Sequence, residues 1–283
     1  MKTLYIFTLL IASTLSMADS LYLSNNNVVT GTIVSMSEDI IKIETDNGIL
    51  EVGKDKIVRG EFYGDGDEIN GNLVFEFLFD GKIKDSSGSG YPIKSKSIPY
   101  REGVDGKKNG AIHSSGTGQY FYIENSNTIS AIEEFTIAMN FFPEDTSENS
   151  FLISNWKNTN SKTGQAEGRF SLSIYKTTIA FYVVDSKGYY QSLFSKDKFN
   201  LKEWNSLAIR FSEGKMSLYV NGETVGENEI SLGTLLKGNW PIYFMTAENG
   251  EDFEKYNFKG KLDKIKMFDS TLSDKELNLL YKL

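Results

Sequence analysis

Apolar and polar residues alternate in short runs along most of the chain. In the run 73–79, for example, Phe75, Phe77 and Phe79 occupy every second position. A period of two places successive side chains on opposite faces of an extended strand, so that one face can be buried. Gly, Asn and Asp separate the runs, and Asn221-Gly222 is the strongest two-residue hairpin signal among them. The pattern predicts an all-β, antiparallel protein.

Helical periodicity is clear near the C-terminus. Ser273 is followed three residues later by Glu276, which is the spacing of a capping box at the start of a helix. Leu277, Leu280 and Tyr281 then lie on one helical face. One C-terminal helix is therefore expected beside the strands.

The first eighteen residues have the composition of a secretory signal peptide. Lys2 gives a basic start, the run 4–15 is mostly apolar, and Ser16-Met17-Ala18 is a cleavage motif of small residues. A buried N-terminal strand and an uncleaved anchor are the alternatives. No later run approaches the length of a membrane span, so the mature chain is expected not to be inserted in a membrane.

Residues 21–63 predict a small β domain. Apolar runs at 28–36, 40–45 and 49–52 are joined by short turns, and Asp46-Asn47-Gly48 offers residues that tolerate positive φ. Four or five short strands within about forty residues resemble an SH3-like or Sm-like barrel in pattern. Residues 64–71 are rich in Gly and acid and are interpreted as a linker to a second domain at 72–283.

The second domain resembles the laminin-G-like and concanavalin A-like lectin family. The resemblance implies a jelly-roll sandwich of two antiparallel sheets. Ser114 and Ser115 depart from it, because the family often has an aromatic residue and an acid there, which weakens any role for that loop in binding an ion or ligand. Five segments carry the resemblance in the family's order: 73–88, 110–123, 134–143, the hairpin 204–223, and 260–277.

Composition excludes several classes of partner and site. The chain of 283 residues has 30 Lys and Arg against 38 Asp and Glu, so no basic surface for nucleic acid is expected. It has no cysteine and no Asn-x-Ser/Thr sequon. Together with the signal peptide, this fits an exported bacterial protein, either periplasmic or secreted and associated with the cell surface.

Catalytic signatures are weak. Glycoside hydrolases of the resembled fold need two facing carboxylates, and their usual strand motif is missing. The acidic group 251–254 is interpreted as a loop. His113 is the single histidine, which excludes a multi-histidine zinc site, and no Gly-x-Ser-x-Gly motif is present. We therefore expect a protein that is not an enzyme.

Asp80 and Asp263 are candidate metal ligands. Alternation places Asp263 on the inward face with Ile265 and Met267, where a carboxylate needs hydrogen-bond donors or a cation. One interpretation is that it accepts backbone N–H bonds. The other is a structural calcium ion shared with Asp80, as in relatives whose first and last strands are adjacent.

Aromatic residues in loops are the candidates for ligand contact, because the apolar faces of sugars stack on aromatic rings. They are Trp156, Tyr190 with its neighbour Tyr189, and Trp240. Ordinary packing is the alternative for each, and Trp204 is assigned to packing.

The combined prediction is an exported, non-catalytic binding protein. Its expected partner is an envelope protein or a glycan. The main hypothesis is an envelope-associated adaptor or structural component that acts through protein–protein contacts. The alternatives are a carbohydrate-binding lectin module and a glycoside hydrolase or lyase with an unrecognised active site.

Overall fold

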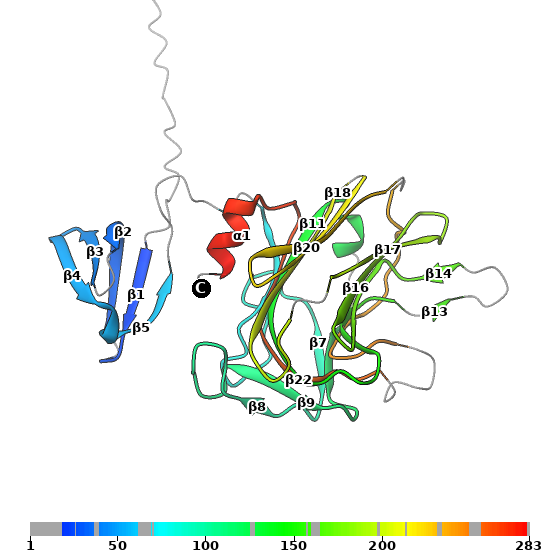
Figure 1. Cartoon of the computed structure of the whole chain (residues 1–283), viewed down its shortest axis with the longest axis horizontal. Helices are drawn as coiled ribbons and strands as arrows, with labels where there is room; N and C mark the ends of the chain where they lie inside the picture. The colour runs from blue at the N-terminus through cyan, green and yellow to red at the C-terminus, as the bar shows by residue number, and fades with distance from the viewer. Residues whose placement is uncertain are drawn as a thin grey trace, which may run out of the picture. The chain divides into compact units, whose positions relative to one another are not determined.

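The computed structural model divides the chain into two compact units, one ending at Glu68 and the other beginning at Ile69. Each is described here by itself (Figure 1). Residues 1–18, where a signal peptide is predicted, and residues 64–68 and 70 of the predicted linker 64–71 lie outside the described part of the chain. The described residues are 19–25, 27–36, 40–61, 69, 71–124, 128–156, 158–159, 165–196, 199–212, 214–230, 234–248 and 256–281.

The N-terminal unit is a five-stranded antiparallel sheet in the order β4-β3-β2-β1-β5. The predicted turn 46–48 joins β3 to β4, with Gly48 at a φ of 106°. Among the side chains that are described, Leu21, Ile41, Ile43 and Val52 form its buried apolar cluster. Closure of the sheet into a barrel is not among the described strand pairings, so the SH3-like barrel stays a prediction. The strands are β1 (Asp19–Leu23), β2 (Val28–Met36), β3 (Ile40–Thr45), β4 (Gly48–Gly53) and β5 (Ile57–Glu61), with η1 (Lys54–Lys56) before β5.

The C-terminal unit is a sandwich of two antiparallel sheets that face each other (Figure 1). The first is seven-stranded, in the order β17-β16-β15-β12-β21-β10-β7. Its strands are β7 (Ile93–Lys96), β10 (Tyr120–Ile123), β12 (Ser150–Ser154), β15 (Phe170–Tyr175), β16 (Thr178–Val184), β17 (Tyr190–Phe194) and β21 (Ile242–Phe244). A separate two-stranded ribbon consists of β13 (Asn158–Thr159) and β14 (Ala166–Glu167).

The second sheet is eight-stranded, in the order β20-β19-β18-β11-β22-β9-β8, and β6 also pairs with β22. The first and last strands of this unit, β6 and β22, therefore lie side by side. The predicted Asn221-Gly222 turn connects β19 to β20, with both residues at positive φ. The strands are β6 (Leu73–Phe77), β8 (Tyr100–Arg101), β9 (Ala111–Ser115), β11 (Phe135–Asp145), β18 (Asn205–Ser212), β19 (Lys215–Val220), β20 (Glu223–Glu229) and β22 (Lys259–Phe268); η2 (Ile129–Ala131) precedes β11.

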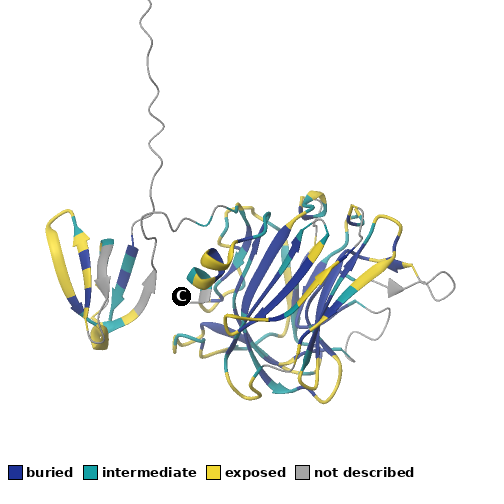
Figure 2. Ribbon diagram, turned by 45° about the horizontal axis from the view of Figure 1, so that its top comes forward, coloured by how far each residue is buried: buried dark blue, intermediate teal, exposed yellow. Residues whose placement is uncertain are grey.

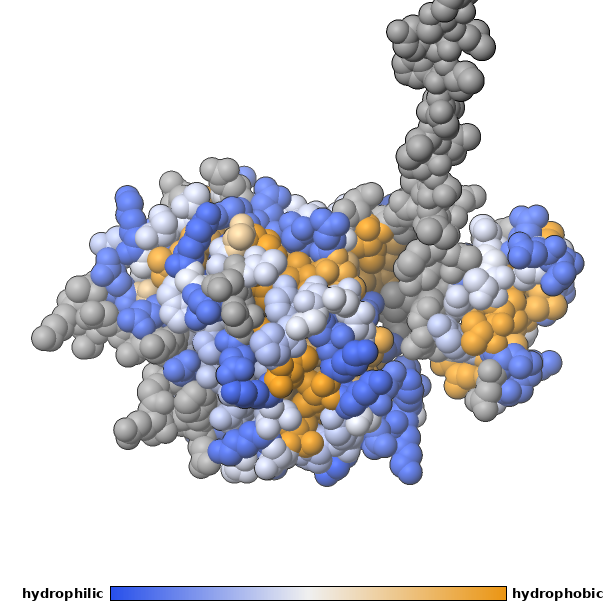
Figure 3. Space-filling view, turned by 180° about the vertical axis from the view of Figure 1, so that it is seen from behind, coloured by the Kyte–Doolittle hydropathy of each residue, from blue (hydrophilic) through white to orange (hydrophobic). Residues whose placement is uncertain are grey.

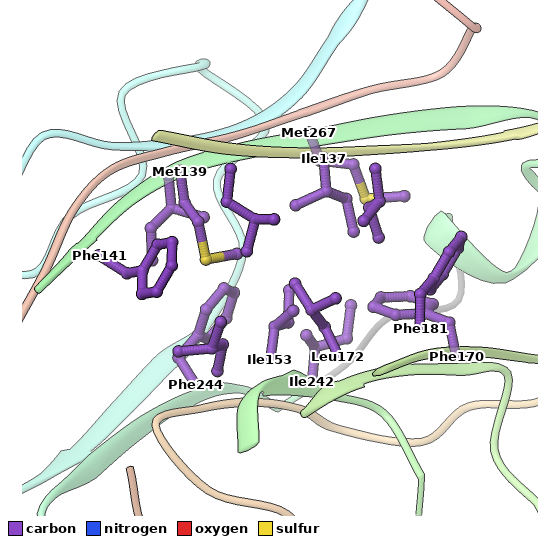
Figure 4. Packing of buried hydrophobic residues seen from close by; sticks show 14 of the residues in the cluster. Ile137, Met139, Phe141, Ile153, Phe170, Leu172, Phe181, Ile242, Phe244 and Met267 are labelled. Atoms are coloured by element: carbon purple, nitrogen blue, oxygen red, sulfur yellow. The ribbon is translucent and has the colours of Figure 1, made fainter. Parts of the chain in front are cut away.

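Apolar side chains from both sheets interdigitate between them (Figure 4). The predicted inward triplet Phe75, Phe77 and Phe79 is buried to 1% exposure or less. Within the seven-stranded sheet, the rings of the cross-strand partners Phe121 and Phe244 stack with centroids 4.2 Å apart. Buried positions follow the strands of both sheets, while loops and turns are exposed (Figure 2). The predicted all-β antiparallel sandwich is confirmed.

The predicted C-terminal helix is α1 (Asp274–Tyr281). Its capping box forms as expected, because the Ser273 N–H donates to Glu276 Oε2 at 2.5 Å and the Glu276 N–H donates to Ser273 Oγ at 3.2 Å. Leu277 and Leu280 pack with Phe268 and Tyr219 on the outer face of the eight-stranded sheet. No helix in the described ranges is long and apolar enough to cross a membrane.

Strand β22 contains an irregularity that changes where Asp263 points. Ala138 pairs with Lys266 but Asn140 pairs with Asp263, so β22 has one extra residue, and Lys264 has a φ of 47°. Leu262, on one side of this bulge, and Ile265, on the other, both enter the core. Asp263 therefore lies on the outer face, and its predicted place on the inward face with Ile265 is wrong because the bulge interrupts the alternation.

We predict that Phe244→Ala destabilises the C-terminal unit by about 3–5 kcal/mol, since it removes a fully buried ring and leaves a cavity. Denaturant unfolding followed by tryptophan fluorescence measures this. All three tryptophans (Trp156, Trp204 and Trp240) lie in this unit, so the signal reports on it alone. The exposed Tyr189→Ala is the control and should change stability by less than about 0.5 kcal/mol. Equal effects of the two variants would contradict the stacked core.

Candidate functional site

The outer face of the seven-stranded sheet carries a groove along β15. Phe170, Leu172 and Ile174 point into the core, so Ser171 and Ser173 point outward. On the neighbouring strand β16, Ala180 and Tyr182 are the cross-strand partners of Ser173 and Ser171. Small side chains therefore form the floor, and larger residues from the adjacent strands stand beside them.

The groove consists of two adjoining hollows. The first hollow, of about 240 Å³, and the second hollow, of about 330 Å³, share Asn149, Ser173 and Tyr182. We call the two together the aromatic groove. The first hollow is also lined by Phe151, Trp156, Ser171 and Tyr190, and the second by Tyr175, Thr178, Ala180 and Phe194.

Aromatic rings at the first hollow contact one another edge to face. Trp156 lies 5.6 Å from Tyr190 and 6.0 Å from Tyr182, measured between ring centroids. Tyr182 also lies 6.0 Å from Phe194, which stands at the second hollow. Tyr175, Tyr190 and Phe194 are between 45% and 53% exposed. Exposed aromatic rings held together in this way form a platform rather than a core.

Polar groups on the groove are available to a ligand. Ser171 and Ser173 are only 2% and 5% exposed. Both side chains line the hollows, where the Asn149 amide and the Thr178 hydroxyl also lie. Burial raises the pKa of the Tyr182 hydroxyl, helped by Tyr190, so it remains a neutral donor. Hydroxyl groups can both donate and accept hydrogen bonds, and an amide offers a donor and an acceptor side by side.

Trp156 is held in place by buried polar contacts. The Trp156 N–H donates to Ser154 Oγ at 3.0 Å, and Asn155 Oδ1 accepts from the N–H groups of Arg169 (2.7 Å) and Phe170 (3.2 Å). Gly168, at a φ of 128°, approaches so closely that a Cβ would lie 2.5 Å from the Trp156 Cα. The backbone that carries Trp156 is therefore tied to the neighbouring segment 168–170.

A second group of tyrosines lies farther along the same face. Tyr122 and Tyr243 are cross-strand partners with rings 5.0 Å apart, and Tyr120 lies 6.0 Å from Tyr243. Tyr243 is 8% exposed, and burial raises the pKa of its hydroxyl above the usual range. None of the three lines either hollow.

Comparison with known proteins places this fold in a family. The model of the concanavalin A-like lectin/glucanases superfamily matches residues 115–278, which is more than half of the chain. The chain belongs to this superfamily. No protein with a curated description matches it at a significant level.

Several solved structures share the superfamily fold. The botulinum neurotoxin serotype D binding domain matches with a TM-score of 0.60 and 19% identity, over 76% of this chain and 51% of that one. The binding domain of Paraclostridial Mosquitocidal Protein 1 matches with a TM-score of 0.57 and 20% identity, over 74% and 52%. The serotype D domain in complex with N-acetylneuraminic acid matches with a TM-score of 0.58 and 16% identity, over 76% of this chain and 51% of that one. The chain spans about half the length of these domains, and at such identities the likeness establishes the fold alone.

The superfamily includes glucanases, and these neighbours are binding domains. The described residues that line the two hollows include no carboxylate. The acidic group 251–254 lies outside the described residues. His113 pairs with Glu144, with Nε2 and Oε1 3.0 Å apart, on the other sheet. The groove as described therefore suits binding and offers no acid–base pair for hydrolysis.

The structure brings together two of the three aromatic residues that the sequence singled out. Trp156 and Tyr190 meet at the first hollow, whereas Trp240 precedes β21, lies over Gly238 and lines neither hollow. Trp204 packs edge to face on Phe142. Sequence reasoning missed Tyr182 and Phe194, and also the serines of β15. Their signal was a strand with small polar residues at every second position, where an exposed strand usually carries larger ones.

Asp80 and Asp263 have protein partners in this superfamily member. Asp80 Oδ1 lies 2.6 Å from Lys107 Nζ. The carboxylate of Asp263 accepts the N–H groups of Val104 at 2.9 Å and Lys264 at 2.7 Å. The described residues contain no cluster of three acidic, His or Cys side chains able to hold a metal ion. N–H donors are not the oxygen ligands that calcium needs, so the calcium hypothesis stays a prediction without support from these contacts.

Asp263 is nevertheless an unusual carboxyl group. It is 2% exposed, and burial raises its pKa to about 7, against the lowering effects of the Val104 N–H and of Lys264. The negative charge of Asp105, whose Oδ2 lies 3.7 Å from Lys264 Nζ, raises the pKa of Asp263 further. Gly103 permits this burial, because a Cβ there would come within 2.7 Å of Asp263 Oδ2. The loop around Gly103 thus covers a carboxyl that titrates near neutral pH.

We predict that Asp263 makes the unfolding free energy fall as the pH rises through neutrality. Its folded pKa of about 7 exceeds the ordinary value of 3.8, so between these values the folded state holds a proton that the unfolded chain releases. The stabilisation is complete below the unfolded pKa and is lost as the pH rises through about 7. Between pH 5 and pH 8 the advantage of wild type over Asp263→Asn should shrink by about 3 kcal/mol.

Denaturant titrations of wild type and Asp263→Asn at several pH values measure this difference. Parallel pH profiles for the two proteins would contradict the raised pKa. Calcium chloride added at pH 8 tests the ion hypothesis in the same samples. Stabilisation of wild type that is missing from both Asp80→Asn and Asp263→Asn would support a calcium site.

Proposed function

We propose that the C-terminal unit is a non-catalytic carbohydrate-binding module whose ligand lies in the aromatic groove. The observation that carries this proposal is the combination of exposed aromatic rings with hydroxyl-bearing side chains on one sheet face. Sugars present apolar ring faces and equatorial hydroxyls, so they need both kinds of contact at once. A purely apolar groove would favour a protein segment or lipid instead.

The superfamily and its structural neighbours support a binding role. The fold hosts lectins as well as glucanases, and one neighbour was crystallised with N-acetylneuraminic acid, which is a property of that protein. Fold likeness alone does not transfer a ligand, so the proposal rests on the groove. A hydrolase is not favoured, because the described lining of the hollows has no carboxylate.

A protein-contact role for the N-terminal unit is the second candidate. Val28, Ile49, Leu50 and Val58 are between 45% and 61% exposed. Figure 3 shows apolar surface on this unit. Exposed apolar groups of this kind are typical of surfaces that bind another protein. They favour the predicted adaptor role in the cell envelope for this unit, beside glycan binding by the other. Export from the cell is part of the same proposal.

We predict that Trp156→Ala and Tyr190→Ala each weaken glycan binding at least tenfold, because each removes a ring from the platform. A glycan array identifies the bound glycan, and calorimetry then measures the affinities. Tyr189→Ala is a matched control, since Tyr189 is 54% exposed and adjacent but lines neither hollow. Its affinity should stay within about twofold of wild type.

Trp240→Ala separates this groove from the other aromatic candidate. Because Trp240 lines neither hollow, its removal should leave binding unchanged. Loss of binding in Trp240→Ala with normal binding in Trp156→Ala would move the ligand elsewhere. A blank array for the wild-type protein would refute the carbohydrate proposal.

A further inference from the structure

The two hollows of the aromatic groove follow each other along one strand. Ser171 lies on the floor of the first, Tyr175 lines the second, and Ser173 lies between them in both. Residues two apart on one face of a strand are separated by about 7 Å. This spacing is comparable to that of successive rings in a glycan chain. The two hollows therefore follow each other along β15 at a spacing that suits two successive sugar rings.

Each hollow has its own aromatic rings and its own hydroxyl. Trp156, Tyr190 and the Ser171 hydroxyl line the first, and Phe194 and the Thr178 hydroxyl line the second. Tyr182 stands at the boundary and lines both. Ala180 lies between its cross-strand partners Ser173 and Phe194. Its small side chain leaves the space between these two residues open and forms part of the second hollow. A larger residue at position 180 would fill this hollow and leave the first unchanged.

The described lining of both hollows carries no charged side chain. An acidic sugar would bring a carboxylate against tyrosine and serine side chains without a cationic partner among the described lining, which is costly. Lys176 reaches the Tyr175 end of the groove, where its ammonium lies 5.0 Å from the Tyr175 ring centroid. It does not line either hollow.

We propose that the aromatic groove binds an uncharged glycan chain of at least two sugar rings, with one ring in each hollow and the chain running along β15. This inference rests on the proposed carbohydrate-binding function and narrows its ligand. It excludes single sugars and acidic sugars as the preferred ligands. It also assigns Ala180 and Phe194 to the second ring and Trp156 and Tyr190 to the first.

Calorimetry with two matched series of sugars tests the inference on the full chain. The neutral probes are linear oligomers of glucose, xylose and N-acetylglucosamine with one to four rings. The acidic probes are galacturonic acid oligomers of the same lengths and N-acetylneuraminic acid. At least one neutral series should bind, and its two-ring oligomer should bind with at least tenfold higher affinity than its single sugar. The acidic probes should bind at least tenfold more weakly than neutral oligomers of equal length.

Variants of the second hollow show whether the second ring lies there. Ala180→Phe should reduce the affinity for the two-ring oligomer to that of the single ring, while the affinity for the single ring changes by less than about twofold. Phe194→Ala, an exposed truncation that leaves the floor intact, should remove most of the gain from the second ring even if Ala180→Phe folds poorly. Tyr189→Ala and Lys176→Ala are controls and should leave the length dependence unchanged.

The possible failures are distinguishable. If no probe in either series binds, the carbohydrate-binding function falls, and this inference falls with it. If acidic oligomers bind as well as neutral ones, or if Lys176→Ala abolishes binding, the function stands and the uncharged ligand is refuted. If affinity does not grow with length, or if it still grows in both Ala180→Phe and Phe194→Ala, the function stands and the two-ring assignment is refuted.

Discussion

The pairing of β22 with three other strands is the constraint on which the C-terminal unit depends. One edge of β22 is hydrogen-bonded to β11, and the other to β9 over its first half and to β6 over its second. The last strand of the sequence thus joins the beginning of the unit to its middle. Such long-range pairing closes the sheet only once nearly the whole chain is present, so the core cannot be complete without it.

The bulge in β22 follows from this double pairing. Where the strand changes partner from β9 to β6, Lys264 takes a positive φ and one extra residue enters the strand. Asp263 lies at that point, covered by the loop that contains Gly103 and Val104. The buried carboxyl with its raised pKa is therefore a by-product of sheet closure. Its two N–H donors account for its burial without a metal ion.

The aromatic groove depends on the same sandwich for its rigidity. Each strand that supplies its floor and walls is anchored in the core by the alternate residues, as Phe170, Leu172 and Ile174 anchor β15. A site on a paired sheet loses little conformational entropy when a ligand binds. The superfamily fold supplies this scaffold, while the choice of ligand lies with the few side chains that face outward. Serine, alanine and tyrosine at those positions make the described lining of the groove open, free of charged side chains and rich in hydroxyls.

The sequence by itself determined the features that depend on neighbours in the chain. Alternation placed Phe75, Phe77 and Phe79 in the core, Asn221-Gly222 placed a turn, and Ser273 with Glu276 placed the start of the helix. It also selected Trp156 and Tyr190 as exposed aromatic residues, though not as neighbours.

Only the tertiary structure decided which residues meet. Ser171 faces Tyr182 because β15 and β16 pair in one register, and Phe194 joins them from a third strand. Asp263 points outward because a bulge reverses the alternation on which its prediction relied. Contacts of this kind are set by strand register across the sheet, and periodicity within one strand carries no information about its partner's register.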